Sequence, residues 1–217
     1  MDQLIFKFPF KTNYFEEDFY VSSNNFEAYK LVESWPKWSS RYINIYGPSG
    51  CGKTHLVNII KKKINSFYIK ASELSDNSLP LIRSKECLII DDYKNNIEEK
   101  LFYSLLSQCH QSNQYIIVNS LESIKTTAII LNDLKSRFDS FIYIGIDLPT
   151  DDLIRVILTK NFSDKQVKIE PRLLEYILKN IQRSYEAIFD LIDKLDSLSL
   201  STGKSININL IKKVLNK

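Results

Sequence analysis

Eight consecutive residues decide the fold of this chain: Gly47-Pro48-Ser49-Gly50-Cys51-Gly52-Lys53-Thr54. An apolar, β-favouring run precedes them at 42–46, and a helical pattern begins at His55. Strand, glycine loop and helix in this order are the context that a phosphate-binding P-loop requires. The glycines let successive backbone N–H groups point into one concavity, and the helix N-terminus adds partial positive charge. The sequence therefore predicts a binding site for a nucleoside di- or triphosphate.

The residues at the end of this loop have distinct predicted roles. Lys53 is expected to reach the outer phosphates, and the Thr54 hydroxyl to ligate Mg²⁺. His55, the next residue, is counted with the nucleotide-binding residues. Cys51 precedes a helix N-terminus, where thiol pKa values can fall, but we favour the interpretation that it is a small filler residue.

Composition places few restrictions on function. The chain has 217 residues, of which 44% are hydrophobic and 25% charged, as in an ordinary globular protein. A net charge of +3 is too small to indicate nucleic acid as the main partner. No apolar run approaches the ~20 residues of a membrane span. The N-terminus does not resemble a signal peptide, because Lys7 and Pro9 interrupt it. Three scattered cysteines favour reduced thiols and a cytoplasmic location.

Strand and helix patterns alternate up to about residue 147, which predicts a five-stranded parallel sheet with helices on both faces. The expected strands are 42–46, 67–69, 87–90, 115–118 and 141–146. Residues 72–85 look irregular. Because ligands bind at the carboxyl ends of parallel strands, the polar residues there should converge on the P-loop.

Polar residues at the ends of two strands, together with one arginine, are candidates for catalysis. Asp91 is expected to hold Mg²⁺ through water, and Asp92 to orient an attacking water. Asn119 or Ser120 could contact the γ-phosphate, and the sequence does not distinguish between them. Arg137 precedes the last strand, so it is placed near the carboxyl-end rim or a neighbouring edge.

After Pro149 the pattern changes to four helices without a strand: 151–160, 171–181, 185–200 and 207–215. We therefore expect an α/β nucleotide-binding domain at 12–147 and a small helical domain at 148–217. Arg183, on the helical domain, could fold over the phosphates. The first segment, 1–11, carries alternating apolar residues, which fit either a partner-binding segment or an edge strand.

Several of these motifs resemble the AAA+ ATPases, and within them the initiator clade that contains DnaA and the Hda-type regulators of DnaA. The resembling segments are Asp18–Asn25, Tyr46–Leu56, Leu131–Phe138, Lys160–Gln166 and Ile181–Ala187. The resemblance implies an AAA+ fold with a helical lid that binds ADP or ATP. It also implies that Arg137 is an arginine finger acting in trans and that Arg183 is the sensor II residue.

The resemblance further implies protein partners. Gln3, Leu4, Phe6 and Phe8 are similar to the family's peptide for the sliding clamp, the beta subunit of DNA polymerase III. This favours a partner-binding tail. The ADP-bound protein would meet DNA indirectly, through the clamp, and would stimulate ATP hydrolysis by DnaA. Intrinsic hydrolysis is expected to be slow, because Asp92 replaces the usual glutamate.

Two other functions are kept as alternatives. One is an adaptor of the helicase-loader type, and the other is a P-loop kinase that acts on a small molecule. No C-terminal DNA-binding domain is expected, and self-association is left open.

Overall fold

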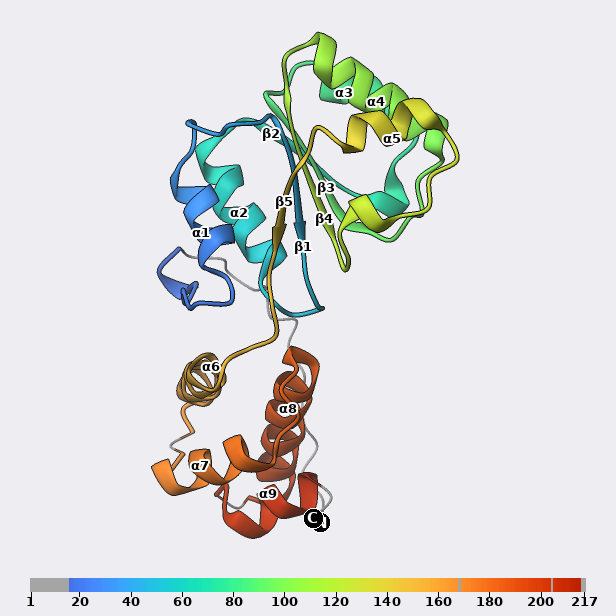
Figure 1. Ribbon diagram of the computed structural model, residues 1–217. Coiled ribbons are helices and arrows are strands. Elements are labelled where there is room, and N and C mark those ends of the chain that lie inside the picture. The colour runs from blue at the N-terminus through green and yellow to red at the C-terminus, as the bar shows by residue number, and fades with distance from the viewer. Residues whose placement is uncertain (1–15, 168, 204, 216–217) are drawn as a thin grey trace. The chain divides into compact units, whose positions relative to one another are not determined.

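The computed structural model describes residues 16–167, 169–203 and 205–215 (Figure 1). The described residues up to Asp147 form one compact unit, and those from Leu148 form a second. Each unit is described by itself. The predicted clamp-binding residues Gln3, Leu4, Phe6 and Phe8 lie outside the described residues.

The first unit is built on a single sheet of five parallel strands in the order β2-β3-β4-β1-β5. Its strands are β1 (Tyr42–Tyr46), β2 (Ser66–Lys70), β3 (Cys87–Tyr93), β4 (Tyr115–Ser120) and β5 (Ile142–Gly145). The parallel sheet predicted from the sequence is therefore confirmed. Apolar runs form the inner strands because a parallel sheet buries both of its faces.

Helices cover both faces of this sheet (Figure 1). On one face lie α1 (Phe26–Glu33) and α2 (Lys53–Lys63). On the other lie α3 (Leu79–Ile82), α4 (Glu99–Gln111) and α5 (Asn132–Phe138). A core of fully buried side chains joins this second layer to the sheet, with Leu88 and Ile90 packed together with Phe102 and Leu105. Short 3-10 turns occupy Glu16–Asp18, Ala71–Glu73, Asp76–Ser78 and Ile124–Thr126.

Three details differ from the sequence-based expectation. The segment 72–85 is not irregular throughout, because Pro80 lies in the first turn of α3, where a missing N–H costs nothing. Helix α5 was not anticipated. Strand β3 continues to Tyr93 through an irregular register after Ile90, and Asp92 adopts a left-handed φ of 58°.

The second unit contains the four predicted helices: α6 (Asp151–Asp164), α7 (Pro171–Asn180), α8 (Tyr185–Thr202) and α9 (Ile208–Val214). Helix α6 extends beyond the predicted end because Phe162 continues the buried series of Ile154 and Leu158. Side chains cap three of the helices: Thr150, Ser184 and Asn207 each accept a bond from a backbone N–H in the first turn.

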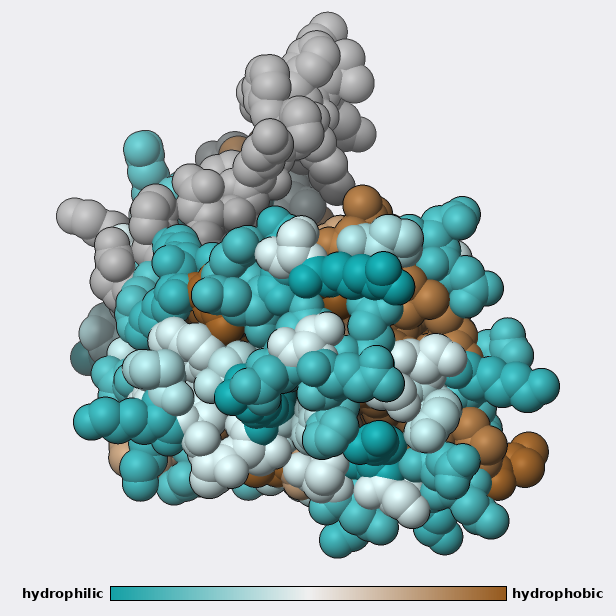
Figure 2. Space-filling view, turned by 90° about the horizontal axis from the view of Figure 1, so that it is seen from above, coloured by the Kyte–Doolittle hydropathy of each residue, from teal (hydrophilic) through white to brown (hydrophobic). Residues whose placement is uncertain are grey.

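The surface seen in Figure 2 is mostly hydrophilic, and the hydrophobic residues on it form small separate patches. Among the larger apolar side chains of the described residues, Ile130 is the most exposed, at 90%. Within the described part of the chain, no helix combines the length and the apolar character needed to cross a bilayer.

Candidate nucleotide-binding site

The P-loop leaves the carboxyl end of β1 and leads directly into α2. Two of its glycines are required by their surroundings. A Cβ on Gly47 would lie 2.5 Å from the carbonyl oxygen of Ile146, and a Cβ on Gly52 would lie 2.9 Å from the Phe19 ring. Gly52 also has a φ of 100°, which side-chain-bearing residues rarely adopt. The loop can therefore wrap closely only with glycine at these positions.

The start of α2 is prepared for an anion. Its Gly52 cap offers no side-chain acceptor, and its first turn contains no acidic residue. The free N–H groups and the helix dipole therefore favour a bound phosphate. The Lys53 ammonium lies over the loop, where it donates to the carbonyl oxygens of Gly47 at 2.7 Å and Pro48 at 3.0 Å.

Asp91 is the centre of the polar contacts beside the loop. It is 7% exposed at the end of β3, and its two oxygens accept four hydrogen bonds. Oδ2 accepts from the Thr54 hydroxyl at 3.1 Å and from the Tyr68 hydroxyl at 2.7 Å. Oδ1 accepts from Asn119 Nδ2 and from the backbone N–H of Asp92, both at 3.0 Å. The carboxylate is thereby held in one orientation.

The Thr54 and Asp91 oxygens form a donor set that suits Mg²⁺. This ion is bound in phosphate sites by one or two oxygen side chains, completed by water and the phosphates themselves. Within the described residues there is no cluster of three or more His, Cys, Asp or Glu side chains that could hold a metal. Thr54 and Asp91 are the residues that would hold Mg²⁺ together with a bound nucleotide.

Asn119 and Ser120, which the sequence could not separate, have different surroundings. Asn119 is fully buried and contacts Asp91, and its Oδ1 accepts no hydrogen bond. The Ser120 hydroxyl instead accepts from Asn44 and donates to the carbonyl oxygen of Glu122. Asn119, and not Ser120, therefore belongs to the contacts of Asp91, and a contact of either residue with the γ-phosphate stays a prediction.

Comparisons with known proteins agree with this geometry. The family model of the Hda lid domain matches residues 151–215, and a model described as RNA helicase matches 43–138. Over 99% of its length the chain is 27% identical to the chromosomal replication initiator protein DnaA of Buchnera aphidicola subsp. Baizongia pistaciae (strain Bp), and it spans about half (53%) of that protein.

Solved structures of DnaA are similar to this chain in fold. Domain III of Thermotoga maritima DnaA superposes with a TM-score of 0.79 at 21% identity, covering 96% of this chain and 98% of that one. This chain has the fold of the DnaA/Hda-type AAA+ ATPases. AMPPCP-bound DnaA from Aquifex aeolicus has a TM-score of 0.68 at 22% identity, covering 88% of this chain and 67% of that one. The expected fold class is confirmed, and the sequence matches agree with the resemblance to DnaA and Hda-type proteins.

In this AAA+ fold, the segment 18–25 lies against the P-loop. Phe19 contacts Gly52 and packs edge-on against the His55 ring, with centroids 5.3 Å apart. Asn24 donates to the carbonyl oxygen of Asp147 at 3.2 Å, where the first unit ends. The segment 18–25, one of those that resemble the family, therefore joins the loop to the end of the sheet.

Asp92 is separated from the buried contacts of Asp91. Its left-handed backbone turns the carboxylate outward, where it is 59% exposed and lies 3.2 Å from the Lys94 ammonium. Its predicted role in orienting water stays a prediction, and that role would require it to leave this ion pair.

Arg137 lies away from its own P-loop. Helix α5 ends at Phe138, just before β5 begins, so Arg137 is near the amino ends of the strands. Burial raises the pKa of Tyr42, the first residue of β1, and the nearby Arg137 cation opposes that rise. Of the two predicted locations, the carboxyl-end rim is wrong, because a residue that precedes a parallel strand lies at the opposite edge.

Two further predicted residues have clear surroundings. Arg183 forms a bidentate ion pair with Asp151 inside the helical unit, at 2.9 and 3.1 Å, so binding a phosphate would require it to exchange partners. Cys51 is 4% exposed, and burial raises the pKa of its thiol more than the nearby Lys53 lowers it. The interpretation of Cys51 as a filler is therefore confirmed.

Tyr68 is the site residue that sequence analysis missed. It lies on β2, next to β3, and its hydroxyl contacts the same Asp91 oxygen as Thr54. The Lys61 ammonium covers its ring, 4.6 Å from the centroid. Only the aromatic character of the strand 67–69 could have suggested such a residue, and an aromatic strand residue is more often part of the core.

We expect Tyr68→Phe to lower nucleotide affinity about fivefold in the presence of Mg²⁺ and to leave the affinity in EDTA unchanged. The Tyr68 hydroxyl is one of four donors that orient the Asp91 carboxylate. Its loss should therefore lower the binding free energy of the Mg²⁺-nucleotide by about 1 kcal/mol. Titration of a fluorescent adenine nucleotide measures both values. Tyr103→Phe, on α4, is the matched control. An equal loss with and without Mg²⁺ would mean that Tyr68 has only a structural role.

Proposed function

We propose that this chain is an Hda-like regulator of the initiation of DNA replication. It binds ADP or ATP with Mg²⁺ and, together with the DNA-loaded sliding clamp, stimulates ATP hydrolysis by DnaA. The observation that carries the proposal is the match of residues 151–215 to the Hda lid, in a chain that resembles DnaA over 99% of its length.

The geometry supports the following roles for the site residues. Lys53 and the start of α2 bind the phosphates, while Thr54 and Asp91 would hold Mg²⁺, which neutralises charge on the phosphate oxygens. Asp92 is exposed and paired with Lys94, which favours slow hydrolysis in this site. In this proposal the nucleotide mainly stabilises the conformation that the partner recognises.

Arg137 supplies the activating group in trans. It lies at the edge of the sheet opposite to its own P-loop, so a neighbouring molecule's phosphates are its natural target. An arginine that approaches the γ-phosphate of DnaA-bound ATP stabilises charge that develops only in the transition state. DnaA would then be converted to its ADP form, which makes this chain a negative regulator of initiation.

The test is an assay of ATP hydrolysis by DnaA with clamp-loaded DNA, using the full chain and a chain that lacks residues 1–10. We expect the full chain to accelerate hydrolysis about 1000-fold or more, as expected for a trans-acting arginine. The shortened chain should lose this effect but keep its nucleotide affinity.

The outcomes separate the alternatives. Absence of acceleration by the full chain contradicts the regulator. Equal activity of the shortened chain contradicts only the role of the clamp peptide. Retrieval of helicase without clamp would indicate the helicase-loader adaptor instead, and phosphate transfer to a metabolite would indicate the kinase.

A further inference from the structure

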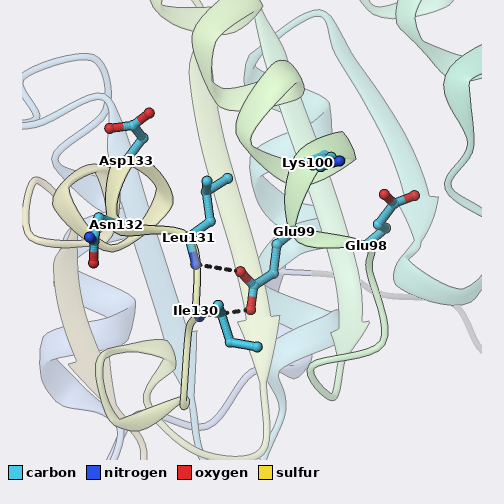
Figure 3. A pocket seen from close by; sticks show the side chains of 7 residues that line it. All are labelled: Glu98, Glu99, Lys100, Ile130, Leu131, Asn132 and Asp133. Carbon is cyan, nitrogen blue, oxygen red and sulfur yellow. Dashed lines mark hydrogen bonds between the residues drawn. The ribbon is translucent and has the colours of Figure 1, made fainter.

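A hollow of about 740 Å³ lies between the first turns of α4 and α5, on the face of the sheet opposite to α2 (Figure 3). Glu98 and Glu99 contribute from the start of α4, and Ile130, Leu131 and Asp133 from the segment that enters α5. The Glu99 carboxylate accepts from the backbone of Ile130 and Leu131, and not from the P-loop residues. The nucleotide site therefore does not explain the hollow.

Glu99 fixes the segment that presents Ile130. Its carboxylate accepts the backbone N–H of Ile130 at 3.0 Å and that of Leu131 at 2.7 Å, as Figure 3 shows. Ile129 and Leu131 pack against the core, whereas Ile130 is 90% exposed. Because Glu99 already fixes the backbone at Ile130, little backbone entropy is lost when a partner buries this side chain, so the isoleucine suits an anchor.

The surroundings of Ile130 are acidic. Three carboxylates line the hollow, those of Glu98, Glu99 and Asp133, against the single lining cation Lys100. Glu98 and Asp133 are exposed at the starts of two helices, where the helix dipole stabilises negative charge. A lysine or arginine of a partner would therefore be attracted to the hollow, and an acidic one repelled.

Helix α5 connects this hollow to Arg137. Asp133 and Arg137 are four residues apart, so they lie on one side of the helix, beside the buried pair Leu134 and Phe138. We propose that Ile130, the acidic hollow and Arg137 form one docking face for the ATP-bound initiator. Ile130 enters an apolar socket of that partner, and a basic side chain next to the socket enters the hollow. This inference rests on the proposed function.

The test measures the dissociation constant of the complex with ATP-bound DnaA on clamp-loaded DNA, together with each variant's own nucleotide affinity. We expect Ile130→Ser and Glu98→Lys each to weaken the complex about tenfold or more, with unchanged nucleotide affinity. Leu81→Ser is the matched control, because Leu81 is also exposed, at 58%, but lies on α3 beside the other end of α4. It should change the constant less than about twofold, since exposed side chains outside an interface contribute little.

Failure of this inference is distinct from failure of the proposed function. If Ile130→Ser binds and stimulates like the unchanged protein while Arg137→Ala does not stimulate, the docking face is overturned and the regulator stands. If the unchanged protein neither binds DnaA nor stimulates it, both are overturned. If Ile130→Ser alters only self-association in sedimentation, the occupant is a second copy of this chain, and the inference is wrong.

Discussion

Replacement of Lys53 by alanine is expected to weaken the binding of ADP and ATP roughly 100-fold. The Lys53 ammonium lies 2.7 and 3.0 Å from two carbonyl oxygens of the P-loop, so it is held at the mouth of the loop where the outer phosphates would bind. Removal of a partly buried charged hydrogen bond to an anion costs about 3 kcal/mol, which corresponds to this loss of affinity. Calorimetric titration with each nucleotide measures it.

The control for this prediction is Lys62→Ala, which removes an exposed lysine from the same helix. It should leave nucleotide affinity within about twofold, as surface charges outside a site have small effects. Circular dichroism of both variants excludes unfolding as the cause. An affinity of Lys53→Ala close to that of the unchanged protein would contradict the assignment of the loop.

The same variant tests whether the nucleotide acts as a conformational anchor. If bound nucleotide prepares this chain for its partner, Lys53→Ala should also lose the stimulation of DnaA at nucleotide concentrations that saturate only the unchanged protein. Full stimulation by Lys53→Ala would show that partner recognition does not depend on the nucleotide.

The sequence predicts most of the fold because its strongest signals are local. The apolar runs 87–90 and 115–118 are typical of buried strands, and the polar residues that follow them placed Asp91 and Asn119 at one edge of the sheet. The P-loop pattern adds the helix that follows. These features depend on residues that are close together in the sequence. Hydrophobic periodicity and turn residues therefore predict them directly.

The features that the sequence does not predict depend on contacts between distant segments. Tyr68 and Asp91 are 23 positions apart in the sequence, and they meet because β2 and β3 are neighbours in the sheet. The Asp92 side chain points outward because its backbone is left-handed, and the local sequence pattern did not predict this conformation. Asn119 and Ser120 are distinguished by their tertiary contacts. Asn119 donates to Asp91, whereas Ser120 accepts from Asn44.

The surroundings of Arg137 are compatible with the proposed trans-acting role. It is half-buried near the end of α5, and none of the salt bridges of the described residues includes it. Arg155 and Arg183, by contrast, are already paired with Glu175 and Asp151. An arginine without a carboxylate partner can approach a phosphate without first breaking an ion pair.

We therefore expect Arg137→Ala to reduce the stimulated hydrolysis of ATP by DnaA about 1000-fold, toward the unstimulated rate, while its own affinity for ADP is unchanged. Single-turnover hydrolysis with clamp-loaded DNA measures the rate. Lys135→Ala, an exposed cation on the same helix, is the matched control and should keep the stimulation.

Arg137→Lys distinguishes two ways in which the charge can act. A lysine keeps the positive charge but cannot donate from a planar fork, so a positioned guanidinium predicts a loss almost as large as with alanine. A general electrostatic effect of the α5 face predicts that Arg137→Lys keeps most of the stimulation and that Lys135→Ala loses part of it. The first result supports direct contact between Arg137 and the phosphate of DnaA-bound ATP, and the second contradicts it, because contact in trans requires geometry as well as charge.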